Sequence, residues 1–274
     1  MATMDINGTT IAYVEKGSGP VVVLLHGFPL DGRMWAGQIE ALAGAGAGVG
    51  AGRHRVIAMD LRGFGASKSA DAFTMESLAD DVHALAEKLG GRGIMPFVLA
   101  GLSMGGYVAL AYVQKYPADL RGLILVDTKA DADSAEGKRG RDQMIELVRK
   151  EGSKAVAEKM EPKMLAPGTL SGRPQIVKQL RGMMEACGAG TIEHALEAVR
   201  ERKDATAALA SIPVPTLIVV GEHDAITPPA VAEGMHKAIP RSELVVIKGA
   251  GHMSPLEQPE QVNHALRQFL GTLL

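Results

Sequence analysis

A serine, an aspartate and a histidine occupy positions in this sequence where together they could perform nucleophilic catalysis. Ser103 lies in the pattern G-x-S-x-G, at Gly101 to Gly105, between an apolar run that ends at Leu102 and a helix-like segment that starts near Met104. On such a tight strand-to-helix turn the serine backbone is strained and its hydroxyl is exposed, and the two glycines remove Cβ atoms that would collide. The hydroxyl would also lie beside a helix N-terminus, whose free N–H groups favour developing negative charge. We predict that Ser103 is a nucleophile.

A serine hydroxyl needs a nearby base, and the sequence favours His252 for this role. It follows the last apolar run, in the glycine-rich segment Lys248 to Met253, and such a loop can project a side chain over the strand ends. His26 ends an earlier strand-like run. His223 is expected to be a supporting or a solvated residue. The other histidines are expected to be solvated; they are His54, His83, His194, His236 and His264.

The imidazole in turn needs a carboxylate that fixes its tautomer and stabilises the imidazolium. Asp224 comes soon after the strand-like run Thr216 to Val220, and Asp127 closes another such run, Leu123 to Asp127. Parallel strands end at one edge of a sheet, so either carboxylate could reach the histidine. We favour Asp224 and keep Asp127 as the alternative. The order Ser103, Asp224, His252 is the order of triads on the α/β-hydrolase fold.

These residues would be positioned by apolar strands that alternate with helical segments. Continuous apolar runs predict strands buried on both faces, and alternation with helices predicts a parallel sheet in an α/β fold. The predicted strands are Val21 to Leu25, Arg55 to Leu61, Pro96 to Leu102, Leu123 to Asp127, Thr216 to Val220 and Leu244 to Ile247. The predicted helices are Met34 to Ala43, Met75 to Leu89, Met104 to Tyr116 and Pro229 to Ala238. Asn7-Gly8 predicts a hairpin before them. The low-complexity tract Gly44 to Gly52 is expected to be a surface loop.

The pattern changes between about residues 129 and 211, where only charged helical segments occur, with Pro162, Pro167 and Pro174 as breaks. We therefore expect a core made of residues 1–128 and 212–274 and a helical cap, or lid, made of residues 129–211. The methionines of this insertion either line an adaptable apolar pocket or fill the core of the cap; they are Met144, Met160, Met164, Met183 and Met184.

Composition argues against several classes of partner. The 29 Lys and Arg residues are balanced by 31 Asp and Glu residues without a basic stripe, so neither nucleic acid nor a membrane surface is expected as a partner. No apolar run suggests a signal peptide or a membrane helix. The single cysteine, Cys187, permits no internal disulfide, which fits the cytoplasm. It is expected to be a small apolar lining residue, although a nucleophilic role is conceivable.

The motifs together resemble the α/β-hydrolase superfamily over nearly the whole chain. They are HGFP at His26 to Pro29, DLRGFGAS at Asp60 to Ser67, GLSMGGY around Ser103 and GEHD at Gly221 to Asp224. HGFPLDGRMW and GLSMGGY resemble small bacterial carboxylesterases, lactonases and cofactor-free haloperoxidase-like perhydrolases. The resemblance implies a mostly parallel sheet of about eight strands with helices on both faces and a lid after the sixth strand. It also implies that the backbone N–H groups of Phe28 and Met104 form the oxyanion hole, and that no metal or cofactor is needed.

The expected function is hydrolysis of carboxylic esters with short to medium acyl chains, through an acyl-enzyme on Ser103. Phe28, Trp35 and Met104 are expected to contact a small, uncharged ester. A lactonase or a carbon–carbon bond hydrolase with the same triad is the alternative, and a ligand-binding protein without turnover is the second. Haloalkane dehalogenases and epoxide hydrolases are disfavoured because they have aspartate at the position of Ser103. The sequence leaves a homodimer open.

Overall fold

The structure is a computed structural model that describes residues 1–44, 54–68, 71–90 and 95–273. The strands are β1 (Ala2–Ile6), β2 (Thr9–Lys16), β3 (Val21–Leu25), β4 (Arg55–Met59), β5 (Phe97–Leu102), β6 (Leu120–Val126), β7 (Thr216–Gly221) and β8 (Ser242–Ile247). The α-helices are α1 (Ala36–Ala43), α2 (Met75–Lys88), α3 (Met104–Lys115), α4 (Ala135–Met164), α5 (Pro167–Gly172), α6 (Pro174–Ala186), α7 (Ala189–Arg200), α8 (Pro229–Ala238), α9 (Ser254–Glu257) and α10 (Pro259–Thr272). Short 3₁₀ turns occur at η1 (Gly32–Trp35), η3 (Pro117–Asp119) and η4 (Thr206–Ser211).

The strands form one eight-stranded sheet in the order β1-β2-β4-β3-β5-β6-β7-β8. From β4 to β8 the pairs are parallel, whereas β2 pairs antiparallel with both β1 and β4. All six strands expected from the apolar runs are present, and the hairpin expected at Asn7-Gly8 is the β1–β2 pair. The fold is therefore the expected α/β-hydrolase fold.

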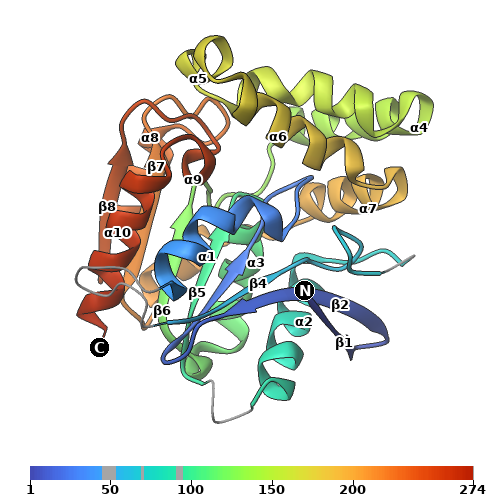
Figure 1. The fold of residues 1–274 in the computed structure, drawn as a ribbon. Coiled ribbons are helices and arrows are strands. Elements are labelled where there is room, and N and C mark those ends of the chain that lie inside the picture. Colours follow the sequence, from blue (N-terminus) through green and yellow to red (C-terminus); the bar gives the residue numbers. More distant parts are fainter. Residues whose placement is uncertain (45–53, 69–70, 91–94, 274) are drawn as a thin grey trace.

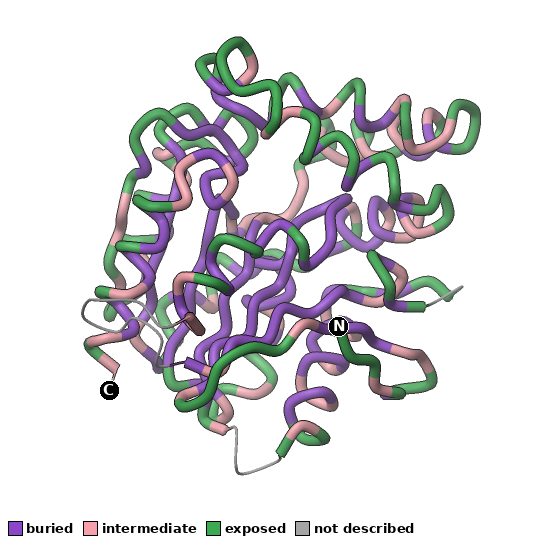
Figure 2. The backbone as a smooth tube through the Cα atoms, viewed as in Figure 1, coloured by how far each residue is buried: buried purple, intermediate pink, exposed green. Residues whose placement is uncertain are grey.

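Each central strand contributes alternate side chains to two apolar layers, one on each face of the sheet. Val23 and Leu25 of β3 belong to one layer, together with residues of α2, α3 and α8. Val22 and Leu24 belong to the other, which α1 and α10 cover. The two layers explain why β3 is buried at every position, and Figure 2 shows the sheet as the buried centre of the molecule.

Helices α4 to α7 lie between β6 and β7 in the chain and are called the cap helices below. They form a layer over one edge of the sheet (Figure 1). Helix α4 is interrupted at Gly152, whose φ of 79° is a left-handed conformation that glycine tolerates. Pro167 and Pro174 begin α5 and α6 as expected of breaks, but Pro162 lies in the last turn of α4 instead of ending a helix.

Two smaller expectations differ from the structure, and one lies outside it. The helix expected from Met34 starts as the 3₁₀ turn η1 and becomes α-helical only at Ala36, because the Asp31 side chain caps the earlier turn by accepting from the N–H of Arg33. His54, expected to be solvated, is 1% exposed because it directly precedes the buried strand β4. Except for Gly44, the expected Gly44 to Gly52 loop lies outside the described residues.

Candidate active site

Ser103 lies on the sharp turn between β5 and α3, with φ 52° and ψ −112°. A positive φ is costly for a serine, so the surrounding contacts must hold it there. The Ser103 N–H donates to the carbonyl of Val126 at 3.0 Å, and the Thr128 hydroxyl donates to the Ser103 carbonyl at 2.8 Å. The end of β6 therefore fixes the turn that carries the serine.

The two glycines that flank Ser103 leave no room for a side chain. A Cβ on Gly101 would lie 2.2 Å from the carbonyl oxygen of Gly105. One on Gly105 would lie 2.5 Å from the carbonyl oxygen of Leu25 at the end of β3. The spacing in G-x-S-x-G thus has the steric cause expected from the sequence, namely close approach of the turn to its own helix and to the neighbouring strand.

His252 and Asp224 lie next to each other at the ends of the strands. The distance from His252 Nδ1 to Asp224 Oδ2 is 2.8 Å, and both residues are buried. Asp224 also accepts hydrogen bonds from the N–H groups of Ile226 and Thr227, each at 2.8 Å, and from the Thr227 hydroxyl at 2.7 Å. These donors fix the carboxylate, which orients the imidazole through Nδ1 and leaves Nε2 as the nitrogen that can exchange a proton with a substrate or a nucleophile.

Burial and charge act in opposite directions on the His252 pKa. Burial is the largest single influence and lowers it. The charge and the hydrogen bond of Asp224, with smaller contributions from the charges of Asp127 and Glu257, raise it. Together these outweigh burial, so the pKa of His252 is raised. For Asp224, burial is the largest influence and raises the pKa, yet His252 and the Thr227 donors together lower it. Both directions describe a pair in which the ionised carboxylate stabilises an imidazolium.

Asp127, the alternative acid, makes a different set of contacts. Its carboxyl group accepts from the Gly221 N–H at 2.8 Å and from the Ser254 hydroxyl at 2.6 Å. Burial first, and then repulsion by the Asp224 carboxylate, raise the pKa of Asp127 to about 8. The 2.8 Å contact with His252 Nδ1 is made by Asp224, whereas the two oxygens of Asp127 bind Gly221 and Ser254, so the geometry assigns the histidine partner to Asp224.

The loop expected to supply the oxyanion hole passes directly against Ser103. A Cβ on Gly27 would lie 3.3 Å from the Ser103 Cβ, and Phe28 follows at once in the chain. Met104 is the first residue of α3, so its N–H group has no acceptor within the helix. The loop is braced by His26, whose Nε2 accepts from the Leu61 N–H at 3.0 Å. Burial lowers the pKa of His26, which keeps it neutral for this acceptor role.

The three residues expected to contact the substrate do not lie together. Phe28 and Met104 pack in the same apolar layer, and Phe28 is 7% exposed. Trp35, the last residue of η1, is fully buried in the opposite layer. Of the methionines between residues 129 and 211, Met164, Met183 and Met184 are buried in that same layer, which favours the cap-core interpretation for them.

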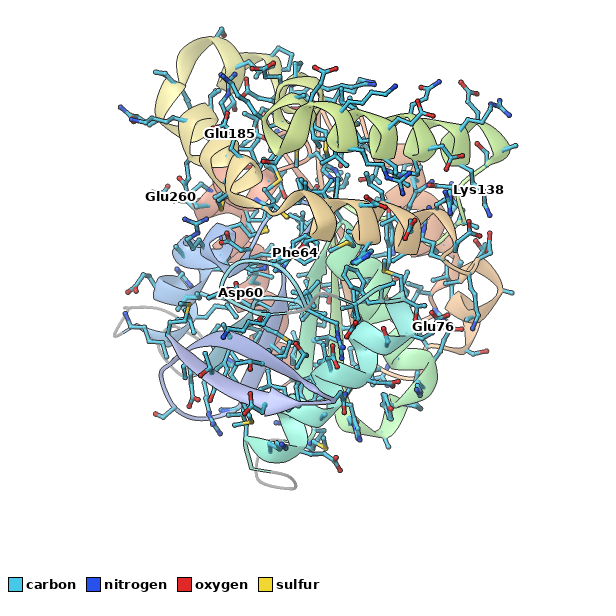
Figure 3. All side chains as sticks on the ribbon, turned by 90° about the vertical axis from the view of Figure 1, so that its right-hand side faces the viewer. Asp60, Phe64, Glu76, Lys138, Glu185 and Glu260 are labelled. Carbon is cyan, nitrogen blue, oxygen red and sulfur yellow. The ribbon has the colours of Figure 1, made fainter. Side chains whose placement is uncertain are left out.

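Rings of the core and the cap meet below the cap helices. Phe64 lies 5.0 Å from His26 and 6.3 Å from Phe73, measured between ring centroids, and Phe73 lies 6.4 Å from His194 of α7. Figure 3 shows Phe64 between the sheet and the cap helices, among densely packed side chains. Within the described ranges no group of three or more histidine, cysteine or acidic side chains could hold a metal ion, and no helix there is long and apolar enough to cross a membrane.

Comparison with known proteins identifies the family. A family model described as the alpha/beta hydrolase fold matches residues 20–259. The chain belongs to the α/β-hydrolase family. It is 32% identical over 274 residues to the AB hydrolase superfamily protein YisY of Bacillus subtilis, with 95% of each chain covered. Accordingly, the protein is an α/β-hydrolase enzyme.

Solved structures of this family include esterases and a lactonase. The chain is 41% identical to a thermophilic esterase from Thermogutta terrifontis, with a TM-score of 0.91 and with 99% of this chain and 97% of that chain covered. It is 26% identical to the enol-lactonase from Burkholderia xenovorans LB400, with a TM-score of 0.88 and with 98% and 99% covered. Members with both activities therefore share this whole fold.

Sequence reasoning missed residues that support the site from a distance. Thr128 binds the turn at Ser103, Ser254 binds Asp127, and Glu257 is a fully buried carboxyl group beside the His252 loop. In the sequence Glu257 is only an isolated acidic residue, and its burial becomes visible in the structure alone. Thr128 had no signal, because its partner lies 25 residues away.

Proposed function

We propose that the protein hydrolyses small, uncharged carboxylic esters with short to medium acyl chains, with Ser103 as nucleophile, His252 as base and Asp224 as the orienting acid. The observation that carries the proposal is that the same end of the parallel strands holds a serine at positive φ on a strand-to-helix turn and a buried histidine bound to a carboxylate at 2.8 Å. A strained serine has little structural use, whereas nucleophilic catalysis needs its exposed hydroxyl.

In the proposed reaction, Ser103 Oγ attacks the ester carbonyl while His252 Nε2 takes the hydroxyl proton. The imidazolium, stabilised by Asp224, then gives that proton to the leaving alcohol, and an acyl-enzyme remains. Water, deprotonated by His252, attacks the acyl-enzyme and releases the acid and free Ser103. The N–H groups of Phe28 and Met104 would stabilise both tetrahedral oxyanions, each contributing about 3 kcal/mol.

The cap, which we propose to comprise residues 129–211, would cover the acyl or alcohol pocket. Phe28 follows Gly27, which lies against Ser103, and packs in one apolar layer with Met104, which supports a mainly apolar wall there. Ester and lactone hydrolysis differ only in whether the leaving alcohol stays attached to the acyl group, so the likeness to the enol-lactonase supports a lactonase as the second candidate.

The test is a turnover panel of p-nitrophenyl esters from acetate to palmitate, with simple lactones alongside, on wild type and on Ser103→Ala. The proposal expects turnover that is highest on short to medium esters and absent in the variant. Turnover of lactones alone would support the second candidate. No turnover in any assay, or turnover that survives in Ser103→Ala, would refute the proposed mechanism.

A further inference from the structure

A buried carboxyl group outside the triad joins the cap helices to the loop that carries His252. Glu257, at the end of α9, is fully buried. Its Oε1 accepts from the N–H of Gly251 at 2.8 Å, and its Oε2 accepts from the N–H of Ala166 at 2.8 Å. Gly251 directly precedes His252, and Ala166 directly precedes α5 of the cap. One side chain therefore binds two backbone amides that are 85 residues apart, one on each side of the boundary between cap and core.

The cap backbone rests directly on the histidine loop at this point. A Cβ on Gly251 would lie 2.5 Å from the nitrogen of Ala166 and 2.7 Å from the carbonyl carbon of Leu165. Leu165 also shares an apolar layer with Ala250 of the same loop. Figure 1 shows α9 at the edge of the core nearest to α5.

A second bond holds the same part of the cap, the segment from Leu165 to Arg173, which is called the cap corner below. Arg173, between α5 and α6, donates from its guanidinium to the backbone carbonyl of Glu257. This bond leaves the carboxyl group of Glu257 untouched. The corner that runs from Leu165 to Arg173 is thus bound to α9 through both the side chain and the main chain of one residue.

Lifting this corner would leave a buried carboxyl oxygen of Glu257 without its donor. A buried polar atom that loses its partner is unfavourable, so the side chain must move or take up water when the corner leaves. Movement of Glu257 in turn frees the Gly251 N–H, which lies one residue from the catalytic histidine. The cap corner and the loop that carries His252 are therefore linked through the carboxyl group of Glu257.

We propose that Glu257 is a positioning residue that couples docking of the cap to the placement of His252, so that the base is aligned only while the Leu165–Arg173 corner is docked on α9. The proposal rests on the proposed function in taking His252 as the base. It implies that opening of the cap for substrate entry or product release loosens the base at the same time, so proton transfer is confined to the closed enzyme.

Glu257 also affects the charge on His252. The acidic groups whose charges act on the imidazole come from three places: Asp224 after β7, Asp127 directly after β6, and Glu257 of α9. When ionised, each of the three favours the imidazolium, but the raised pKa of Asp127 reduces its contribution near neutral pH. Removing the charge of Glu257 therefore lowers the pKa of His252 and moves the acidic limb of the activity profile to lower pH.

The first test is hydrogen exchange of the Ala166 and Gly251 amides in Arg173→Ala, which weakens the cap corner but leaves both bonds of the Glu257 carboxyl group available. The proposal expects faster exchange at both amides, with the rest of the core unchanged. Faster exchange at Ala166 alone, with Gly251 as protected as in wild type, would overturn it, and so would unchanged exchange at both.

The second test compares Glu257→Gln with Glu260→Gln, a matched removal of one charge at the exposed start of α10 (Figure 3). The amide in Glu257→Gln keeps one acceptor oxygen and loses the other. We expect kcat to fall about 10- to 100-fold through misplacement of the base, with KM changed much less, and the acidic limb to move to lower pH. Glu260→Gln should match wild type. A wild-type profile in Glu257→Gln would refute the proposal.

The two tests also separate this proposal from the proposed function. Exchange needs no turnover, and the pKa of His252 can be followed by NMR titration in the absence of substrate. If wild type hydrolysed no ester while Arg173→Ala exposed both amides, the ester hydrolase proposal would fail and the coupling would stand. If Glu257→Gln did not fold, Arg173→Ala would still decide the question.

Discussion

At the scale of single residues, environment decides between two aspartates, of which the sequence favoured Asp224 without excluding Asp127. Asp127 and Asp224 both follow parallel strands and reach the same edge of the sheet, so position alone left both open. Asp224 is surrounded by donors and binds His252, whereas Asp127 is bound to Gly221 and Ser254 and has a pKa that burial and the Asp224 carboxylate raise. Ser103 was easier to predict, because its signal is local: two glycines and a strand-to-helix junction within five residues.

The two aspartates should therefore differ sharply when each is changed to asparagine. Asp224→Asn should lower kcat about 10⁴-fold, because the amide favours the wrong imidazole tautomer. Asp127→Asn should cost about 1 kcal/mol of folding free energy, through one weakened hydrogen bond, and reduce kcat about tenfold or less. Steady-state kinetics and urea unfolding measure both effects. The reverse ranking in kcat would show that Asp127 is the acid.

The pH dependence of activity should reflect the raised pKa of His252. Only the neutral imidazole accepts the proton of Ser103, so activity is lost where His252 is protonated and rises through its pKa. Because the Asp224 pair raises that pKa, the midpoint of the acidic limb of kcat/KM should lie above the ordinary histidine value of about 6.5. A limb below that value, or a flat profile from about pH 5 to 9, would contradict His252 as the base.

At the scale of elements, the turn between β5 and α3 shows how sequence pattern becomes geometry. The apolar runs predicted the strands, and G-x-S-x-G predicted a tight turn. The pattern could not show that the glycines face the end of β3 as well as their own helix, because that contact joins segments about 80 residues apart. Likewise, the start of η1 before α1 is determined by the side chain of Asp31, which caps this turn, and not by the helical period.

Two glycine substitutions should have opposite effects on stability. Gly105→Ala places a methyl group 2.5 Å from the Leu25 carbonyl and should lower the free energy of unfolding by about 3 kcal/mol. Gly182→Ala, on the exposed face of α6 with no atom within 4 Å of the new methyl group, should raise it by about 1 kcal/mol through the better helix propensity of alanine. Chemical denaturation measures both. Equal effects would show that the turn has room to adapt.

At the scale of the whole molecule, the cap and the core are joined by a few polar side chains whose partners are distant in sequence. The sequence indicated a helical insertion, since apolar strand runs are missing from it. How that insertion rests on the core depends on Glu257, Arg173 and Arg202, and no local period reveals such contacts. Arg202, just after α7, binds the carbonyl of Asp131 at 2.7 Å and the carboxylate of Asp133 at 2.9 Å, so it ties together the two chain segments that connect cap and core.

Loss of this tie should destabilise the protein. Arg202→Met should lower the free energy of unfolding by about 3 kcal/mol, because it breaks a buried ion pair and leaves the Asp131 carbonyl unpaired, although Asp133 keeps Arg141 at 2.9 Å. The control is Arg200→Met, whose partners Asp142 and Glu201 are exposed and should contribute little. Thermal or urea unfolding compares the two, and equal losses would argue against Arg202 as the tie.

The proposed mechanism depends above all on Ser103 being a nucleophile that His252 activates. The most direct measurement is covalent labelling with an organophosphate, read by intact mass and by mapping of the modified peptide, on wild type, Ser103→Ala and His252→Ala. We expect one label on Ser103 in wild type, none in Ser103→Ala and much slower labelling in His252→Ala. Labelling of a different residue, or a wild type that is never labelled, would contradict it.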